Sequence, residues 1–178
     1  MDNRAKFTRC CAKLVLRINR FSEFTGRLTA WLVIALVALI FYDVTMRYLF
    51  NSGSVALQEL EWHFFAVIIL FGAGYTLKHG DHVRVDIIYA SKRLSDRHRL
   101  IIDIVGNLLF LIPFATLIIW NATPFAYQAF IQGEISPDPG GLSHRWILKA
   151  AIPVGFGLLA LQGVADTIEK LLELSDDV

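Results

Sequence analysis

The chain has 178 residues, of which 55% are apolar and 19% charged. That is more apolar surface than a soluble core of this size can hide, so the composition indicates a membrane protein and argues against a soluble helical bundle. The 17 basic and 16 acidic residues nearly cancel, so the net charge itself says nothing about nucleic acid or acidic partners. For a membrane protein we expect no nucleic-acid partner. Cys10 and Cys11 are neighbours that cannot build a disulfide framework, so we expect free thiols.

Four apolar stretches predict an all-α integral membrane protein, because a span needs about 20 predominantly apolar residues. The predicted spans lie in one membrane domain of residues 1–178 and cover residues 28–50, 57–77, 100–131 and 146–166. The third span is longer than the hydrocarbon core, so it has to tilt, bend at Pro113 or project beyond the membrane past Pro124. A cleaved signal peptide is not expected, because the basic segment before the first span is long and no small-residue cleavage site follows.

Basic residues are unevenly distributed among the segments outside the spans. Seven precede the first span and six lie between the second and the third, whereas the two remaining loops hold few. Positive segments stay on the cytoplasmic side, so both termini are expected to be cytoplasmic.

The N-terminal segment, residues 5–25, has the periodicity of an amphipathic helix. Its apolar side holds Phe7, Leu14, Ile18 and Phe21, and its basic side includes Lys13 and Arg17. We predict an interfacial arm on the inner leaflet, with the basic side toward anionic lipid head groups. The alternative is a disordered basic tail that only sets the topology.

Four ionisable residues lie near the loop between the first two spans. Asp43 and Arg47 are one helical turn apart and can pair. Arg47 can instead reach Glu59 or Glu61 at the start of the second helix and fix the hairpin, or all four side chains can sit in water at the interface. A substrate or proton site is disfavoured, because these groups lie too near the membrane surface.

The sequence contains no strong catalytic or metal-binding motif. His79, Asp81 and His82 lack a fourth ligand at a familiar spacing, so we expect a hydrogen-bonding loop and not a metal site. The sequence has no Walker loop and no nucleophile elbow, so we expect no enzyme activity and no cofactor.

Small residues predict where the spans pack. Gly72 and Gly74, together with Ala151 and Gly155, permit close approach of helices in lipid.

Four pieces of sequence, taken in order, point to a family. They are residues 47–50 (RYLF) followed by Glu59, Glu61 and Trp62; residues 71–75 (FGAGY) leading to residues 82–86 (HVRVD); residues 136–142 (SPDPGGL) with Arg145 and Trp146; and Pro153, Gly155 and residues 161–163 (LQG). Their order and spacing resemble the small, DctQ-like membrane subunit of tripartite ATP-independent periplasmic (TRAP) transporters. The resemblance covers about residues 21–172.

The resemblance implies a non-catalytic small permease subunit in the bacterial inner membrane. Such a subunit is the scaffold for a large membrane subunit in a sodium-driven transporter of carboxylate-type solutes, to which a periplasmic binding protein delivers the solute. The candidate structural and partner-interface residues are Asp43, Arg47, Glu59, Glu61, Trp62, Gly72, Gly74 and His82.

Two other functions are weighed against this one. A four-helix haem or quinone anchor of a redox complex needs histidines well inside the spans, but His63 is near a helix end and the other histidines fall in loops. A self-sufficient exporter needs a buried acid within a span, and Asp43 and Asp103 lie close to span ends.

Overall fold

The computed structural model describes residues 2–80 and 95–176, and all regular secondary structure in this part of the chain is helical. The elements are α1 (Asp2–Leu49), α2 (Val55–His79), α4 (Asp96–Gly106), a π-helical turn η1 (Asn107–Leu111), α5 (Ile112–Ile131) and α6 (Trp146–Asp176). Four helical stretches are long and apolar enough to cross a membrane: Thr8–Leu49, Val55–His79, Asp96–Ile131 and Trp146–Ser175. The predicted fold class, all-α with four membrane-spanning helices, is confirmed.

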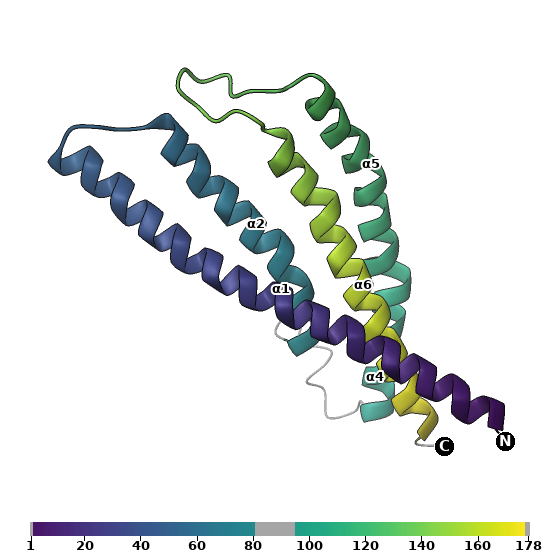
Figure 1. Cartoon of the computed structure of the whole chain (residues 1–178). Helices are drawn as coiled ribbons and strands as arrows, with labels where there is room; N and C mark the ends of the chain where they lie inside the picture. The colour runs from purple at the N-terminus through teal and green to yellow at the C-terminus, as the bar shows by residue number, and fades with distance from the viewer. Residues whose placement is uncertain (1, 81–94, 177–178) are drawn as a thin grey trace.

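α1 is one unbroken helix of 48 residues, about 72 Å long at 1.5 Å per residue. The predicted N-terminal helix is therefore continuous with the first span. Figure 1 shows α1 running obliquely across the other helices, with its first half extending past α6. Because the helix does not turn near Gly26, its first half can follow a membrane surface only if the whole of α1 is strongly tilted.

The helices pack in series: α1 on α2, α2 on α6, and α6 on α5, with α1 also crossing α6. Within residues 2–80 and 95–176, α5 makes no comparable contact with α1 or α2, so the arrangement is an open slab and not a closed four-helix bundle. The first and last described residues lie at one end, here called the terminal end, with the start of α4 (Figure 1). Residues 50–54 and 132–145 form the loops of the opposite, loop end (Figure 1).

The third span runs through α4, η1 and α5 as one continuous helix of 36 residues. Pro113 is the second residue of α5, in the first turn after the π turn. Proline has no N–H and its ring crowds the carbonyl one turn earlier, and a π turn widens the helix at such a site. Pro124 lies inside α5, which continues to Ile131.

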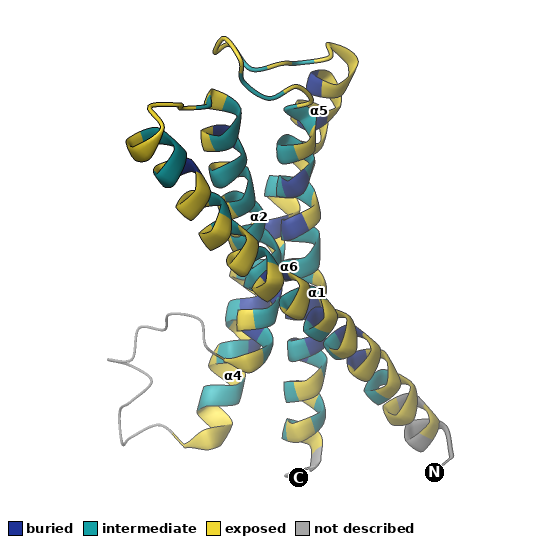
Figure 2. Ribbon diagram, turned by 60° about the vertical axis from the view of Figure 1, so that its left-hand side comes forward, coloured by how far each residue is buried: buried dark blue, intermediate teal, exposed yellow. Residues whose placement is uncertain are grey.

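The buried positions include many small residues, while many large apolar residues are exposed. Figure 2 shows exposed residues along the length of each helix. Buried apolar residues of the third and fourth spans include Ala115, Ala126, Ala129, Ala151 and Ala165. The predicted close approach occurs between α2 and α6, where a Cβ on Gly155 would lie 2.9 Å from the carbonyl oxygen of Leu70 and one on Gly74 would lie 3.4 Å from that of Leu158. Gly72 instead faces α1, at ordinary contact distance from Thr29.

Candidate functional site: polar clusters at the two ends of the slab

Arg47 joins α1 to α2 at the loop end. Its Nη2 donates to Asp43 Oδ2 at 2.5 Å, and Asp43 is only 3% exposed. With the side-chain amide of Gln58 oriented so that its oxygen faces the guanidinium, that oxygen also accepts from Arg47 Nη1 at 2.6 Å. Of the arrangements the sequence left open, the structure shows the Asp43 pair. The expectation that Arg47 reaches Glu59 or Glu61 does not fit, because one turn of helix already brings Asp43 within reach.

Glu59 fixes the other loop of the loop end, residues 132–145, on α2. It is 4% exposed, and its carboxylate accepts hydrogen bonds from the Ser136 hydroxyl and from the backbone N–H of Leu142 at 2.6 Å. The loop closes on itself through Ser136 N–H to the Leu142 carbonyl at 3.0 Å. Gly140 turns the chain with φ +81°, a backbone conformation that glycine adopts without steric cost. A charged acceptor inside a tight loop fixes the loop on α2.

Aromatic and charged side chains surround this loop. The guanidinium of Arg145 lies 5.7 Å from the ring centroid of Trp62, within range for a cation–π contact. His63 Nδ1 donates to the Glu59 backbone carbonyl at 2.5 Å. Among the described residues Glu61 Oε1 is buried without a hydrogen-bond partner. Glu61 and Trp62 thus flank the Glu59 cluster without belonging to it.

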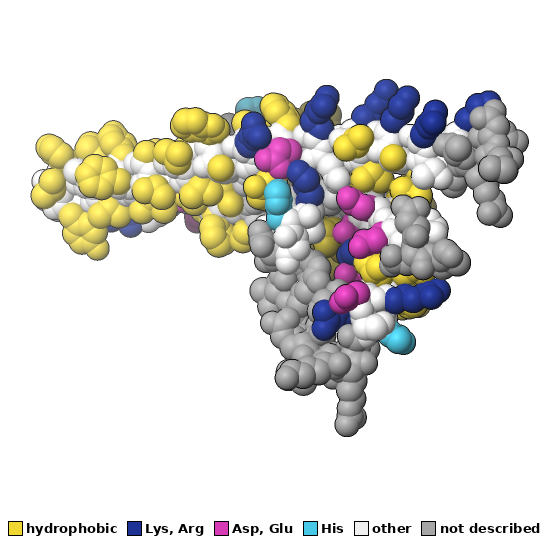
Figure 3. Space-filling view, turned by 90° about the horizontal axis from the view of Figure 1, so that it is seen from below, with side chains coloured by type: hydrophobic (Ala, Val, Ile, Leu, Met, Phe, Trp, Pro, Cys, Tyr) yellow, Lys and Arg dark blue, Asp and Glu magenta, His cyan; other side chains and the backbone are white. Residues whose placement is uncertain are grey.

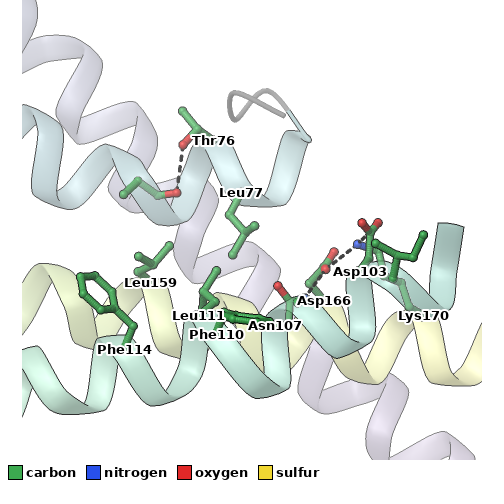
Figure 4. Close-up of a pocket in the computed structure, with 13 residues that line it drawn as sticks. Thr76, Leu77, Asp103, Asn107, Phe110, Leu111, Phe114, Leu159, Asp166 and Lys170 are labelled. Carbon is green, nitrogen blue, oxygen red and sulfur yellow. Dashed lines mark hydrogen bonds and ion pairs between the residues drawn. The ribbon is translucent and has the colours of Figure 1, made fainter. Parts of the chain in front are cut away.

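A second cluster lies in a cleft at the terminal end (Figure 4). Lys170 Nζ is 2.8 Å from Asp103 Oδ2 and 2.6 Å from Asp166 Oδ2, which ties α4 to α6. Asn107 Nδ2 donates to the same Asp166 oxygen at 2.7 Å. The cleft has a volume of about 670 Å³, and its walls away from this cluster are apolar, formed by side chains such as Leu77 and Phe110.

A third cluster fixes α1 on α6. Gln162 is 1% exposed; its side-chain oxygen accepts from the Ser22 hydroxyl at 2.6 Å and its nitrogen donates to Asn19 at 2.9 Å. Glu23, the residue after Ser22, pairs with Lys78 at 2.7 Å and links α1 to α2. Sequence reasoning missed this cluster and Gln58, because their partners are distant in sequence or carry no charge. It also missed the Lys170 cluster, although the spacing of Asp166 and Lys170, one helical turn apart, could have indicated that pair.

The first half of α1 carries basic side chains along one edge, seen from the terminal end in Figure 3. Leu14 and Phe21 are 47% and 46% exposed, as a lipid-facing side requires. Ile18 is 6% exposed and is packed inside the chain, so its predicted place on the lipid-facing side is wrong. The amphipathic pattern does not distinguish a side that meets lipid from one that meets another helix. The side chain of Phe7, and His82 entirely, lie outside the described residues.

The described clusters join helices and loops. Within residues 2–80 and 95–176, no group of three or more His, Cys, Asp or Glu is placed to hold a metal ion. The charged members of these clusters lie outside residues 28–42, 64–77, 104–132 and 150–165, which contain no Asp, Glu, Lys or Arg.

Comparison with known proteins decides the family. Residues 36–173, well over half of the chain, match the DctQ component of tripartite ATP-independent periplasmic transporters. The chain belongs to this family. The match includes the Arg47, Glu59 and Lys170 clusters but leaves the basic part of α1 outside it. A DctQ-family chain is a small permease subunit of a TRAP transporter, which confirms the resemblance seen in the sequence.

Relatives carry the same description. The C4-dicarboxylate TRAP transporter small permease protein DctQ of Vibrio cholerae is 27% identical over 81% of this chain and 71% of its own length. The sialic acid TRAP transporter small permease protein SiaQ of the same species is 25% identical over 88% of this chain and 84% of its own length. A small permease protein of Haemophilus influenzae is 29% identical over 58% of this chain and 59% of its own length.

Proposed function

We propose that this DctQ-family chain is the non-catalytic scaffold for the large membrane subunit of a sodium-driven, binding-protein-dependent transporter of carboxylate-type solutes. Its termini are cytoplasmic in a bacterial inner membrane, and its loop end faces the periplasmic binding protein. The first half of α1 interacts with membrane lipid.

The observation that carries the proposal is how little of each span the chain itself covers. In the most apolar 18-residue stretch of the four spans, 11%, 11%, 17% and 22% of residues are buried. Four helices in an open slab expose large side chains, for example Trp31 and Trp120 at 70% and 79%. Such a slab has the surface of a subunit that stands beside a larger one.

The middle of the spans lacks the features of a transport site, which favours a scaffold role. Transporters bind solute and ions at interrupted helices near the midplane. In the part of the chain that the structure describes, each span is continuously helical, and residues 28–42, 64–77, 104–132 and 150–165 contain no Asp, Glu, Lys or Arg. The solute and sodium sites therefore belong to the partner.

The solute class and the orientation rest on separate observations. Two relatives are named for C4-dicarboxylates and for sialic acid, both of which carry carboxylates. The terminal end holds the basic residues of α1, as a cytoplasmic end requires.

Complex formation tests the proposal. The chain is expressed with the large permease gene of the same transporter and purified through a tag on this chain alone. We expect a stable complex that contains the large subunit in a fixed ratio and survives gel filtration. If the chain purifies alone, or with haem-containing redox subunits, the scaffold function is wrong.

A further inference from the structure

The cleft at the terminal end lies between α2 and the third span (Figure 4). Both pack on α6, but within residues 2–80 and 95–176 they make no comparable contact with each other, so a gap remains between them. The lining extends from Asp103 to Phe114 on the third span and from Leu159 to Lys170 on α6. Each of these stretches is about 16 Å long at 1.5 Å per residue. The cleft is therefore a long, narrow feature that follows the helices.

The two ends of the cleft differ in polarity. Asp103, Asp166 and Lys170 line one end. The rest of the lining is mostly apolar and includes Leu77, Phe110, Leu111, Phe114 and Leu159. The hydroxyl of Thr76 also lies in this apolar part, but it donates to the Ala73 carbonyl at 2.9 Å. The cleft thus has the polarity of a lipid, with a charged end and a hydrocarbon-like length.

The charged end lies at the boundary of the uncharged part of the spans. Asp103 and Asp166 border the uncharged stretches 104–132 and 150–165, and on α2 Lys78 borders the uncharged stretch 64–77. Three helices therefore place this boundary at the same end of the cleft. From there the lining reaches about 16 Å inward, roughly half of a hydrocarbon core of about 30 Å. The cleft spans the depth of one leaflet, and its charged end lies at the level of the head groups.

The cross-section of the cleft is too small for a helix. Over a length of about 16 Å, the volume of about 670 Å³ corresponds to a mean cross-section of roughly 40 Å². An α-helix with its side chains is about 10 Å wide, which requires roughly 80 Å². A hydrocarbon chain is thinner and flexible, and lipid tails are as apolar as the leucine side chains of the walls. The size of the cleft therefore favours a lipid tail over a helix of another chain.

The charges favour one class of head group. Lys170 Nζ lies 2.8 Å from Asp103 and 2.6 Å from Asp166, and the three side chains remain 16–17% exposed. A carboxylate can accept about four hydrogen bonds, and those from a charged donor are the strong ones. A primary ammonium group therefore complements the two carboxylates, while the Lys170 ammonium complements a phosphate. A head group with both charges matches this end of the cleft.

We infer that this cleft binds one phospholipid with a primary-amine head group, taken from the leaflet at the terminal end. An acyl chain lies along Phe110 and Leu159, and the head-group ammonium donates to the carboxylates of Asp103 and Asp166. The site goes beyond the proposed scaffold function and does not depend on it, because all of the residues named here belong to this chain.

Native mass spectrometry tests the choice of head group. The chain is reconstituted in nanodiscs that contain equal amounts of phosphatidylethanolamine and phosphatidylcholine with the same acyl chains, and is then released in mild detergent. Phosphatidylcholine is the matched control, because its quaternary ammonium has no N–H to donate. We expect one retained lipid per chain and a roughly tenfold preference for phosphatidylethanolamine, as a single hydrogen bond between charged groups predicts. No retained lipid, or equal retention of the two, would overturn the inference.

A pair of glycine variants tests the position of the site. Gly106 lines the cleft, and a Cβ there would meet nothing within 4 Å, so the side chain of Gly106→Phe has room to occupy the cleft. A Cβ on Gly157 would also meet nothing within 4 Å, but Gly157 does not line the cleft, which makes Gly157→Phe the matched control. We expect Gly106→Phe to lose the retained lipid and Gly157→Phe to keep it, with the circular dichroism of wild type in both. Undiminished retention by Gly106→Phe would contradict the site. The head-group comparison uses the wild-type chain and decides the inference without either variant.

Photo-crosslinking distinguishes a lipid from the large subunit as the occupant. A photoreactive amino acid replaces Phe110, which lines the cleft and is 72% exposed, in membranes that also contain the large permease. We expect the label on phosphatidylethanolamine. A crosslink to the large subunit in place of lipid would overturn the inference and leave the scaffold function standing.

Discussion

Glu59 is an acidic side chain whose surroundings come from its own chain. Its carboxylate is enclosed by α2 and by the loop of residues 132–145, and both oxygens accept hydrogen bonds from that loop. The sequence indicated Glu59 as a candidate but not its partners, because Ser136 and Leu142 are about 80 positions away along the chain and neither is charged. The spacing of residues in a sequence predicts side-chain contacts only within about one turn of a helix. The Asp43–Arg47 pair could be predicted because its residues are four positions apart.

We expect Glu59→Ala to lower the free energy of unfolding by about 3 kcal/mol, because the Ser136 hydroxyl and the Leu142 N–H lose a charged acceptor. Glu59→Gln keeps one acceptor oxygen and should cost about half as much. Ser136→Ala removes a single donor and serves as the matched control. Unfolding in detergent, followed by circular dichroism, should rank the variants in that order. A Glu59→Ala protein as stable as wild type would show that the carboxylate does not hold the loop.

Gln162 is the corresponding residue at the crossing of α1 and α6. Gln162→Leu keeps the volume but removes the hydrogen bonds to Ser22 and Asn19. We expect the first half of α1 to loosen, because hydrogen bonds between membrane helices contribute about 0.6 kcal/mol each on average. Spin labels at the exposed Arg20 and Glu169 should give a broader distance distribution in the variant than in wild type. An unchanged distribution would mean that packing alone positions α1.

At the scale of the elements, close approach positions α2 on α6. A Cβ on Gly155 would meet the Leu70 backbone, whereas a Cβ on Gly157, two residues later, would meet nothing within 4 Å. The sequence predicted Gly155 and Gly74 as contact residues from their type alone. It could not separate them from Gly72, because glycine is frequent in membrane helices on any face.

The two glycines form a matched pair for mutagenesis. Gly155→Ala should destabilise the protein by about 1–3 kcal/mol, because the added methyl group has to push α2 and α6 apart. Gly157→Ala should be neutral or stabilising by up to about 1 kcal/mol through helix propensity. Thermal unfolding of both variants in the same detergent measures the difference. Equal stability of the two would mean that α2 and α6 are not in close contact at Gly155.

The first half of α1 shows how a pattern can be correct and its interpretation incomplete. The periodicity predicted a helix with apolar and basic sides, but part of the apolar side, including Ile18, packs inside the chain. The pattern of charged residues predicts which side of a helix faces water. Whether the apolar side packs against lipid or against another helix depends on the tertiary structure, which the pattern does not predict.

Spin labels placed along α1 separate lipid from water. Labels at Leu14 and Phe21, which are exposed on the apolar side, should be accessible to oxygen from the bilayer. Labels at Lys13 and Arg17 should be accessible to a water-soluble relaxation agent, because the basic side faces anionic head groups. Ile18→Glu is not a test of lipid contact, since it places a charge inside the fold. Equal water accessibility at all four labelled positions would exclude a membrane-seated arm.

For the whole molecule, the sequence was sufficient for the fold class and the family. The number of long apolar segments predicts the number of membrane spans. The order of the short motifs was enough to recognise the family, whose match extends over residues 36–173. The open arrangement of the helices was not predictable. Whether four spans close into a bundle or stand in series depends on which small-residue faces meet, and this chain leaves much of its apolar surface exposed.

Reconstituted uptake tests the central claim, that this chain supports a transporter without being one. Proteoliposomes are prepared with this subunit alone, with the large subunit alone and with both, and radiolabelled carboxylate solute is added with its binding protein under a sodium gradient. We predict sodium-dependent uptake only when both subunits are present, because the described spans carry no charged or interrupted site at mid-depth. Sodium-driven uptake by this subunit alone, or full uptake by the large subunit without it, would contradict the account.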